Sequence, residues 1–148
     1  MDPQLKRAFA PVYTAEGEDA VTQMRLVVLS AITEAINEKG IEPSATAYYG
    51  ALMSSLTAQK GGDAPEHTVA AAAYLMEQLI PCLPAAVRVS QGADTVALLL
   101  VCQSSYAASA IMARHVLACL GQLLTAQPDT IWEQVRPPCT HAPSSRVL

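Results

Sequence analysis

The chain has 148 residues, of which 51% are hydrophobic and only 15% are charged, and its formal net charge is −4. This length normally corresponds to one domain, and the low charged fraction indicates that much of the surface is apolar or covered. Nucleic-acid-binding modules are normally basic, so the acidic balance and the scattered Lys and Arg residues disfavour direct binding of RNA or DNA.

The first predicted helix covers residues 19–39. Its apolar residues recur at spacings of three and four, as one stripe of a helix requires: Val21, Met24, Val28, Ile32, Ala35 and Ile36. Asp19 suits the positive start of this helix, Lys39 suits its end, and Gly40 suits the position after the C-cap. Residues 1–18 are predicted to be an N-terminal extension that is only partly ordered.

A second helix is predicted from Ser44, which can cap it, to about Lys60, with Tyr48, Leu52 and Leu56 along one side. The stretch "KGGDAPEH", residues 60–67, then interrupts the helical pattern.

Asp63 followed by Glu66 resembles a capping box for a third helix that ends at Ile80, before Pro81 and Pro84. A membrane span needs about 20 predominantly apolar residues. The apolar run that begins at Val69 is shorter and contains a glutamate, so a buried helix is predicted.

The next residues, 84–89, are predicted to form a short helical turn, and "SQGAD" at 90–94 a second break. Helix should resume over 95–103. The last long helix is predicted over 106–126 and is apolar almost all round, which is typical of a helix buried on several sides. A further short helix is predicted at 127–135, with Trp132 as its packing anchor.

These elements predict an all-α fold, because strand-like alternation with turn dipeptides is missing from the sequence. Residues 19–135 are expected to form an α-solenoid of HEAT- or armadillo-type antiparallel helical hairpins. A compact helical bundle is the alternative. Residues 136–148 are rich in Pro and Ser and are predicted to be a disordered tail.

The four cysteines show no CxxC spacing and indicate reduced thiols of an intracellular protein: Cys82, Cys102, Cys119 and Cys139. His115 and Cys119 lie four residues apart, but structural zinc usually needs a second close pair of ligands, so core packing is the preferred explanation. No metal or cofactor is predicted.

Catalytic candidates are also weak. Cys82 and His67 are possible nucleophile and base only by elimination, and the pair Glu34 and Glu38 fits a solvated helix face. Gly61-Gly62 is an isolated pair and not a phosphate loop. In Tyr48-Tyr49 one ring is expected in the core and the other could contact a partner. We therefore predict no enzyme, and no catalytic, cofactor-binding or metal residue is assigned.

Three blocks in order carry a resemblance to a known family: "VVLSAITEAINEKGIEPSATAYYGALMSSLTAQ" at 27–59, "VAAAAYLMEQLIPCLPAAVRV" at 69–89 and "RHVLACLGQLLTAQPDTIWEQ" at 114–134. Over about 21–134, the chain resembles the N-terminal helical region of the ribosomal RNA-processing protein 12-like family. That family consists of long HEAT-repeat, karyopherin-like proteins.

The resemblance implies a scaffold segment of a ribosome-biogenesis factor in the nucleus and nucleolus, acting in ribosomal RNA processing and in pre-ribosomal subunit maturation and export. It implies pre-ribosomal particles, their proteins and nuclear transport factors as partners. No membrane partner is predicted, because the apolar run from Val69 is short and contains a glutamate. A generic HEAT- or armadillo-type adaptor unrelated to ribosomes is the alternative. No binding residue of the family maps onto this chain.

The resemblance stops near Gln134, while the family's chains are many times longer. We therefore expect this chain to be part of something longer, whether a fragment, an alternative transcript or an incomplete gene model. Such an array should leave an apolar face open around Leu120 and Leu124, so self-association or poor solubility is predicted.

Overall fold

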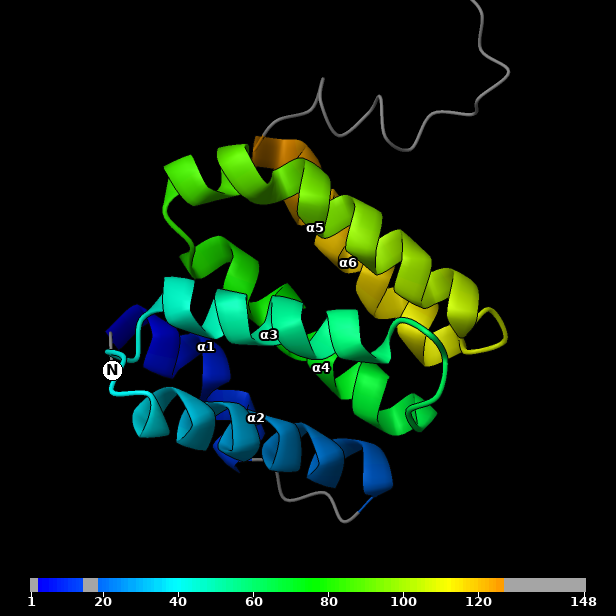
Figure 1. Cartoon of the computed structure of the whole chain (residues 1–148), viewed down its shortest axis with the longest axis horizontal. Coiled ribbons are helices and arrows are strands. Elements are labelled where there is room, and N and C mark those ends of the chain that lie inside the picture. The colour runs from blue at the N-terminus through cyan, green and yellow to red at the C-terminus, as the bar shows by residue number, and fades with distance from the viewer. Residues whose placement is uncertain (1–2, 15–18, 127–148) are drawn as a thin grey trace, which may run out of the picture.

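The computed structural model describes residues 3–14 and 19–126, which form helices without any strand (Figure 1). The elements are α1 (Pro3–Thr14), α2 (Ala20–Glu38), α3 (Ala45–Gln59), α4 (Glu66–Leu79), the 3-10 turn η1 (Ile80–Cys82), α5 (Ala85–Ser105) and α6 (Ala110–Ala126). The predicted all-α class is confirmed.

The ends of α2 are made by the residues that the sequence indicated. The Asp19 carboxylate accepts hydrogen bonds from the Thr22 backbone N–H at 2.8 Å and from its hydroxyl at 2.9 Å, and the backbone bond lowers the pKa of Asp19. At the other end Gly40 adopts φ +68°, and the N–H groups of Gly40 and Ile41 donate to carbonyls of the last turn. This is the Schellman arrangement, which needs a residue in the left-handed region.

The start of α4 differs from the prediction. Ser44 caps α3 as expected, with its hydroxyl accepting from the Ala47 N–H at 3.2 Å. The N-cap of α4, however, is Pro65, without a side-chain capping bond. The carboxylate of Glu66 accepts from the Ser109 hydroxyl at 2.9 Å, which ties the start of α4 to the start of α6. The predicted capping box between Asp63 and Glu66 is therefore wrong.

Two predicted boundaries near α5 are also wrong. This helix runs without interruption through residues 90–94, and Gly92 is buried within it. One glycine costs a helix only about 1 kcal/mol, which packing against neighbouring helices offsets. The last helix begins at Ala110 rather than at Tyr106, because Tyr106 ends α5 and the Ser109 hydroxyl accepts from the Met112 N–H at 3.1 Å.

Residues 3–14 form a helix that the sequence analysis did not identify. Leu5, Phe9 and Val12 are buried at helical spacing, and the Phe9 ring lies 5.4 Å from that of Tyr48. The helix packs against α2, α4 and η1. The predicted short helix at 127–135 with Trp132, the tail at 136–148 and Cys139 lie outside the described residues.

The helices form three stacked antiparallel pairs, α1 with α2, α3 with α4, and α5 with α6 (Figure 1). Helix α3 packs side by side with α5, while α2, α4 and α6 form a second row. Such layered pairs are the architecture of an α-solenoid. The array buries a single continuous core, to which α4 contributes most because it contacts α1, α2, α3 and α6.

The central position of α4 explains the most apolar stretch of the sequence. Its alanines at 70–73 are almost fully buried, and Leu75, Met76 and Leu79 are fully buried. Of the described helices, α5 is the one long and apolar enough to cross a membrane by length and composition. It packs against α3 and α6 and buries Val96, Leu99 and Cys102, while only 28% of its apolar window is buried.

Candidate binding surface

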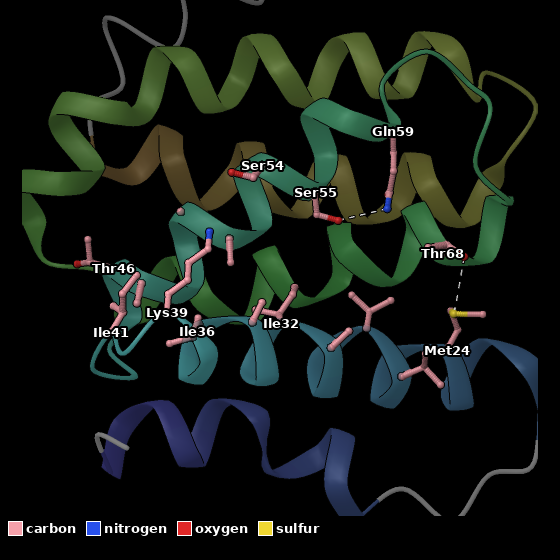
Figure 2. A pocket seen from close by; sticks show the side chains of 17 residues that line it. Met24, Ile32, Ile36, Lys39, Ile41, Thr46, Ser54, Ser55, Gln59 and Thr68 are labelled. Carbon is pink, nitrogen blue, oxygen red and sulfur yellow. Dashed lines mark hydrogen bonds between the residues drawn. The ribbon is translucent and has the colours of Figure 1, made fainter.

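An open groove of about 940 Å³ runs between α2 and α3, and we call it the α2–α3 groove (Figure 2). It follows α2 from Met24 to Lys39 and α3 from Thr46 to Gln59. One end is closed by Thr68 of α4, whose hydroxyl lies 3.7 Å from the Met24 sulfur. The volume is within the range of natural ligand-binding clefts.

The two walls of the groove differ in character. The α2 wall is aliphatic and contains Met24, Val27, Val28, Ala31, Ile32, Ala35 and Ile36. The α3 wall is built mostly from small residues: Thr46, Ala47, Gly50, Ala51, Ser54 and Ser55. Val27 is 58% exposed and Ile41, at the groove's end, is 48% exposed. Within the predicted apolar stripe of α2, Val28, Ile32 and Ile36 line the groove but are buried in the core, so the open part of this wall is formed mainly by Val27, Ala31 and Ala35.

Charge is sparse along this surface. Lys39 is the single charged residue among those that line the groove. The other polar groups are hydroxyls and the amide of Gln59, whose Nε2 donates to the Ser55 hydroxyl at 3.2 Å. The groove is suited to an apolar ligand, and nothing along it provides a nucleophile and a base together.

Apart from the groove, a cluster of polar side chains connects α2, α4 and α6. His115 Nδ1 lies 2.8 Å from the Glu77 carboxylate, and His115 Nε2 lies 3.4 Å from an Arg25 nitrogen. The Arg25 guanidinium lies 3.8 Å above the centre of the Tyr74 ring. If Nδ1–H donates to Glu77, then Nε2 accepts from Arg25, so the neutral imidazole satisfies both neighbours. The cluster holds three helices together.

This arrangement explains the spacing of His115 and Cys119 without a metal. The Cys119 thiol is fully buried and contacts the Ala73 carbonyl oxygen at 3.7 Å. Burial raises the pKa of the Cys119 thiol well above its ordinary value, so in this packed position the thiol stays protonated. Among residues 3–14 and 19–126, no three His, Cys, Asp or Glu side chains come together in a metal-binding group.

The structure separates the other pair considered for catalysis. His67 lies in the first turn of α4, while Cys82 follows the end of that helix. At a rise of 1.5 Å per residue this places them about 20 Å apart. Glu34 and Glu38 are exposed along α2, as expected for a solvated face.

Both adjacent tyrosines are core residues. The Tyr48 hydroxyl lies 2.8 Å from the Thr33 hydroxyl, and the Tyr49 hydroxyl lies 2.6 Å from that of Thr95. Tyr48 is 0% exposed and Tyr49 is 7% exposed, so neither ring is available to a partner. The glycine pair Gly61-Gly62 lies in the loop before α4, where Gly62 has φ +89°, so this pair forms a turn.

Residues 20–141 match the family model "RRP12-like, N-terminal HEAT repeats". The chain belongs to the RRP12-like family. The resemblance inferred from the three sequence blocks is thereby confirmed, and the match continues past Gln134, where the resemblance was expected to stop.

Curated members of the RRP12-like family give the same result. The RRP12-like protein of Gallus gallus is 34% identical over 119 residues, which is 79% of this chain and 9% of the relative. The protein of Homo sapiens is 32% identical over the same shares, and that of Drosophila melanogaster is 32% identical over 82% of this chain. The chain thus spans about 9% of the length of these relatives. No solved structure matches it.

The α2–α3 groove lies entirely within the part of the chain that matches the RRP12-like family, whereas α1 lies outside it. This groove was not predicted from the sequence. Its signal was present in α3, where Ala47, Gly50, Ala51 and Ser54 recur at helical spacing and mark a face of small side chains.

Proposed function

We propose that this chain is a non-enzymatic scaffold segment of a ribosome-biogenesis factor, acting in ribosomal RNA processing and in the maturation and export of pre-ribosomal subunits. The match of residues 20–141 to the RRP12-like N-terminal HEAT repeats carries the proposal. Its partners are the protein components of pre-ribosomal particles, together with nuclear transport factors, and its location is the nucleus and nucleolus.

The described surface supports a protein-binding role over a catalytic one. The α2–α3 groove is apolar with one charged lining residue, which suits a protein partner. The clustered polar side chains, Arg25, Glu77 and His115, bond to one another inside the helical array. The net charge of −4 disfavours direct contact with RNA, so docking through the protein components of a particle is favoured.

Sedimentation of the tagged 148-residue chain from a nuclear extract tests this proposal. The extract is separated on a density gradient with and without RNase, and fractions are probed for the tag and for precursor ribosomal RNA. A tagged inert protein of similar mass is the control for non-specific migration.

Co-migration with precursor ribosomal RNA, lost when RNase breaks the particles, is the expected result. Soluble chain that stays at the top of the gradient would contradict the proposal that these residues carry a docking surface. In that case a general helical-repeat adaptor role would gain support.

A further inference from the structure

We propose that the α2–α3 groove is the docking site for an amphipathic α-helix of a protein partner, one that carries acidic residues in its N-terminal turn. The inference names a surface and a ligand chemistry for the proposed scaffold. It depends on the proposed function only for where the partner is found.

The arrangement of the helices in two rows indicates that the groove can accommodate one further helix. Within this array α5 lies beside α3, on the side away from α2. In a regular stack of three helix pairs, α1, the helix paired with α2, would occupy the corresponding position on the other side of α3. Helix α1 packs against α2, α4 and η1, with Phe9 against Tyr48 of α3, and none of its residues lines the groove, so it does not fill that position. The groove is therefore an open helix position of the solenoid.

The dimensions agree with one helix of about four turns. The α2 wall extends from Met24 to Lys39, which at 1.5 Å per residue is about 22 Å. A helix of about 15 residues has that length. The volume of about 940 Å³ leaves room for several large apolar side chains along its length.

The walls are complementary to such a helix. On α3 the groove face consists of small residues, and a Cβ added at Gly50 would meet no atom within 4 Å. Large side chains of a docked helix can therefore lie against α3 while their other sides contact Val27, Ala31 and Ala35, the exposed apolar residues of the α2 wall. An apolar stripe repeating at three and four residues is the pattern that such grooves bind.

The single charge sets the direction of the helix. Lys39 lies at the end of the groove where α3 begins, near Ile41 and Thr46 (Figure 2). A helix that runs parallel to α3, as neighbours in one row of a solenoid do, places its first turn beside Lys39. Acidic residues are favoured in a first turn by the helix dipole and here also by the Lys39 ammonium. One lysine is too little for RNA, which needs several phosphate contacts.

The probe is a synthetic peptide of about 16 residues, made helical by a side-chain bridge, with a leucine stripe and two glutamates in its first turn. Fluorescence anisotropy measures its binding to the whole chain. A second peptide has lysines in place of the glutamates, and oligouridine is the competitor that tests for nucleic acid.

Two glycine variants form a matched pair. Gly50→Leu fills the groove, while Gly121→Leu adds the same side chain on α6, where an added Cβ also meets no atom within 4 Å. Both replace a helical glycine by a better helix former, so both should fold, which circular dichroism checks. The chain and Gly121→Leu should bind the acidic peptide equally, and Gly50→Leu should bind it at least about tenfold more weakly.

Charge reversal tests the direction of the helix. Lys39→Glu should weaken binding of the acidic peptide about fivefold and favour the lysine peptide. Equal binding by Gly50→Leu and the unmodified chain, displacement by oligouridine, or no binding at about 1 mM would overturn the proposal. No ribosomal material is present in this assay, so its failure would leave the gradient experiment to decide the proposed function.

Discussion

The hydrogen bond between Tyr49 and Thr95 joins α3 to α5, and its removal one partner at a time gives an asymmetric prediction. The Thr95 hydroxyl donates to the Gln91 carbonyl at 2.8 Å, so its oxygen must accept from the Tyr49 hydroxyl at 2.6 Å. Thr95 is 1% exposed and Tyr49 is 7% exposed, so water cannot readily replace either partner.

The two single changes leave different groups unpaired. Thr95→Val leaves the buried Tyr49 hydroxyl without an acceptor and should cost about 1–3 kcal/mol. Tyr49→Phe removes one hydrogen bond while Thr95 keeps its bond to Gln91, and should cost about 1 kcal/mol. In the double variant no polar partner is left behind, so its cost should be smaller than the sum of the two.

Urea denaturation followed by circular dichroism measures the free energy of unfolding of all four chains. Thr57→Val is the control, because the exposed Thr57 hydroxyl makes the same bond to its own helix, at 2.7 Å from the Met53 carbonyl, without a partner on another helix among the described residues. That control should change stability by less than about 0.5 kcal/mol. Single costs that add to within about 0.3 kcal/mol in the double variant would refute the coupling.

Three further predictions concern backbone, ionisation and association. Gly40→Ala should destabilise the chain by about 1–2 kcal/mol, because φ is +68° at this position. Gly50 has an ordinary helical backbone, so Gly50→Ala should stabilise the chain by about 0.5–1 kcal/mol in the same denaturation assay. Equal effects of the two changes would contradict this prediction. Burial raises the pKa of the Tyr48 and Tyr49 hydroxyls above 10.0, so their neutral forms favour the folded state. The free energy of unfolding should therefore be retained below about pH 10 and fall as pH rises through the raised pKa values, as measured by tyrosine absorbance together with denaturation. Ionisation of all tyrosines at the ordinary value would refute this. Self-association should appear in light scattering over a hundredfold range of concentration and decrease in Leu117→Lys, since Leu117 is 63% exposed; a clean monomer throughout would count against it.

The structure relocates the apolar face to which self-association was assigned. The sequence analysis placed it around Leu120 and Leu124, but Leu120 is only 8% exposed and Leu124 packs against the core. The exposed apolar residues of α5 and α6 are instead Val89, Val101 and Leu117. Leu117, Leu120 and Leu124 all lie on α6, which is almost wholly apolar, so periodicity alone could not distinguish its covered side from its open side.

Local sequence signals predicted helix boundaries correctly where no contact with another helix outweighed the capping residues. The boundaries of α2 followed from Asp19 and Gly40, and the start of α3 followed from Ser44, because caps depend on residues adjacent in sequence. The predicted break at 90–94 and the Asp63 cap were wrong because contacts with other helices outweighed the local preferences of about 1 kcal/mol. Helix α1 was missed because only three of its residues enter the core.

The sequence by itself determined the all-α class, the membership of the RRP12-like family and the absence of any convincing catalytic motif. These follow from composition, periodicity and the order of residues, which need no knowledge of distant contacts. Only the tertiary structure decided that both tyrosines are internal, that Arg25, Glu77 and His115 form one cluster, and that a groove stays open between α2 and α3. An apolar stripe indicates that a surface can be covered, but which of its residues are covered depends on where the chain places the neighbouring helices: here Val28, Ile32 and Ile36 are buried, while Val27 beside them is 58% exposed.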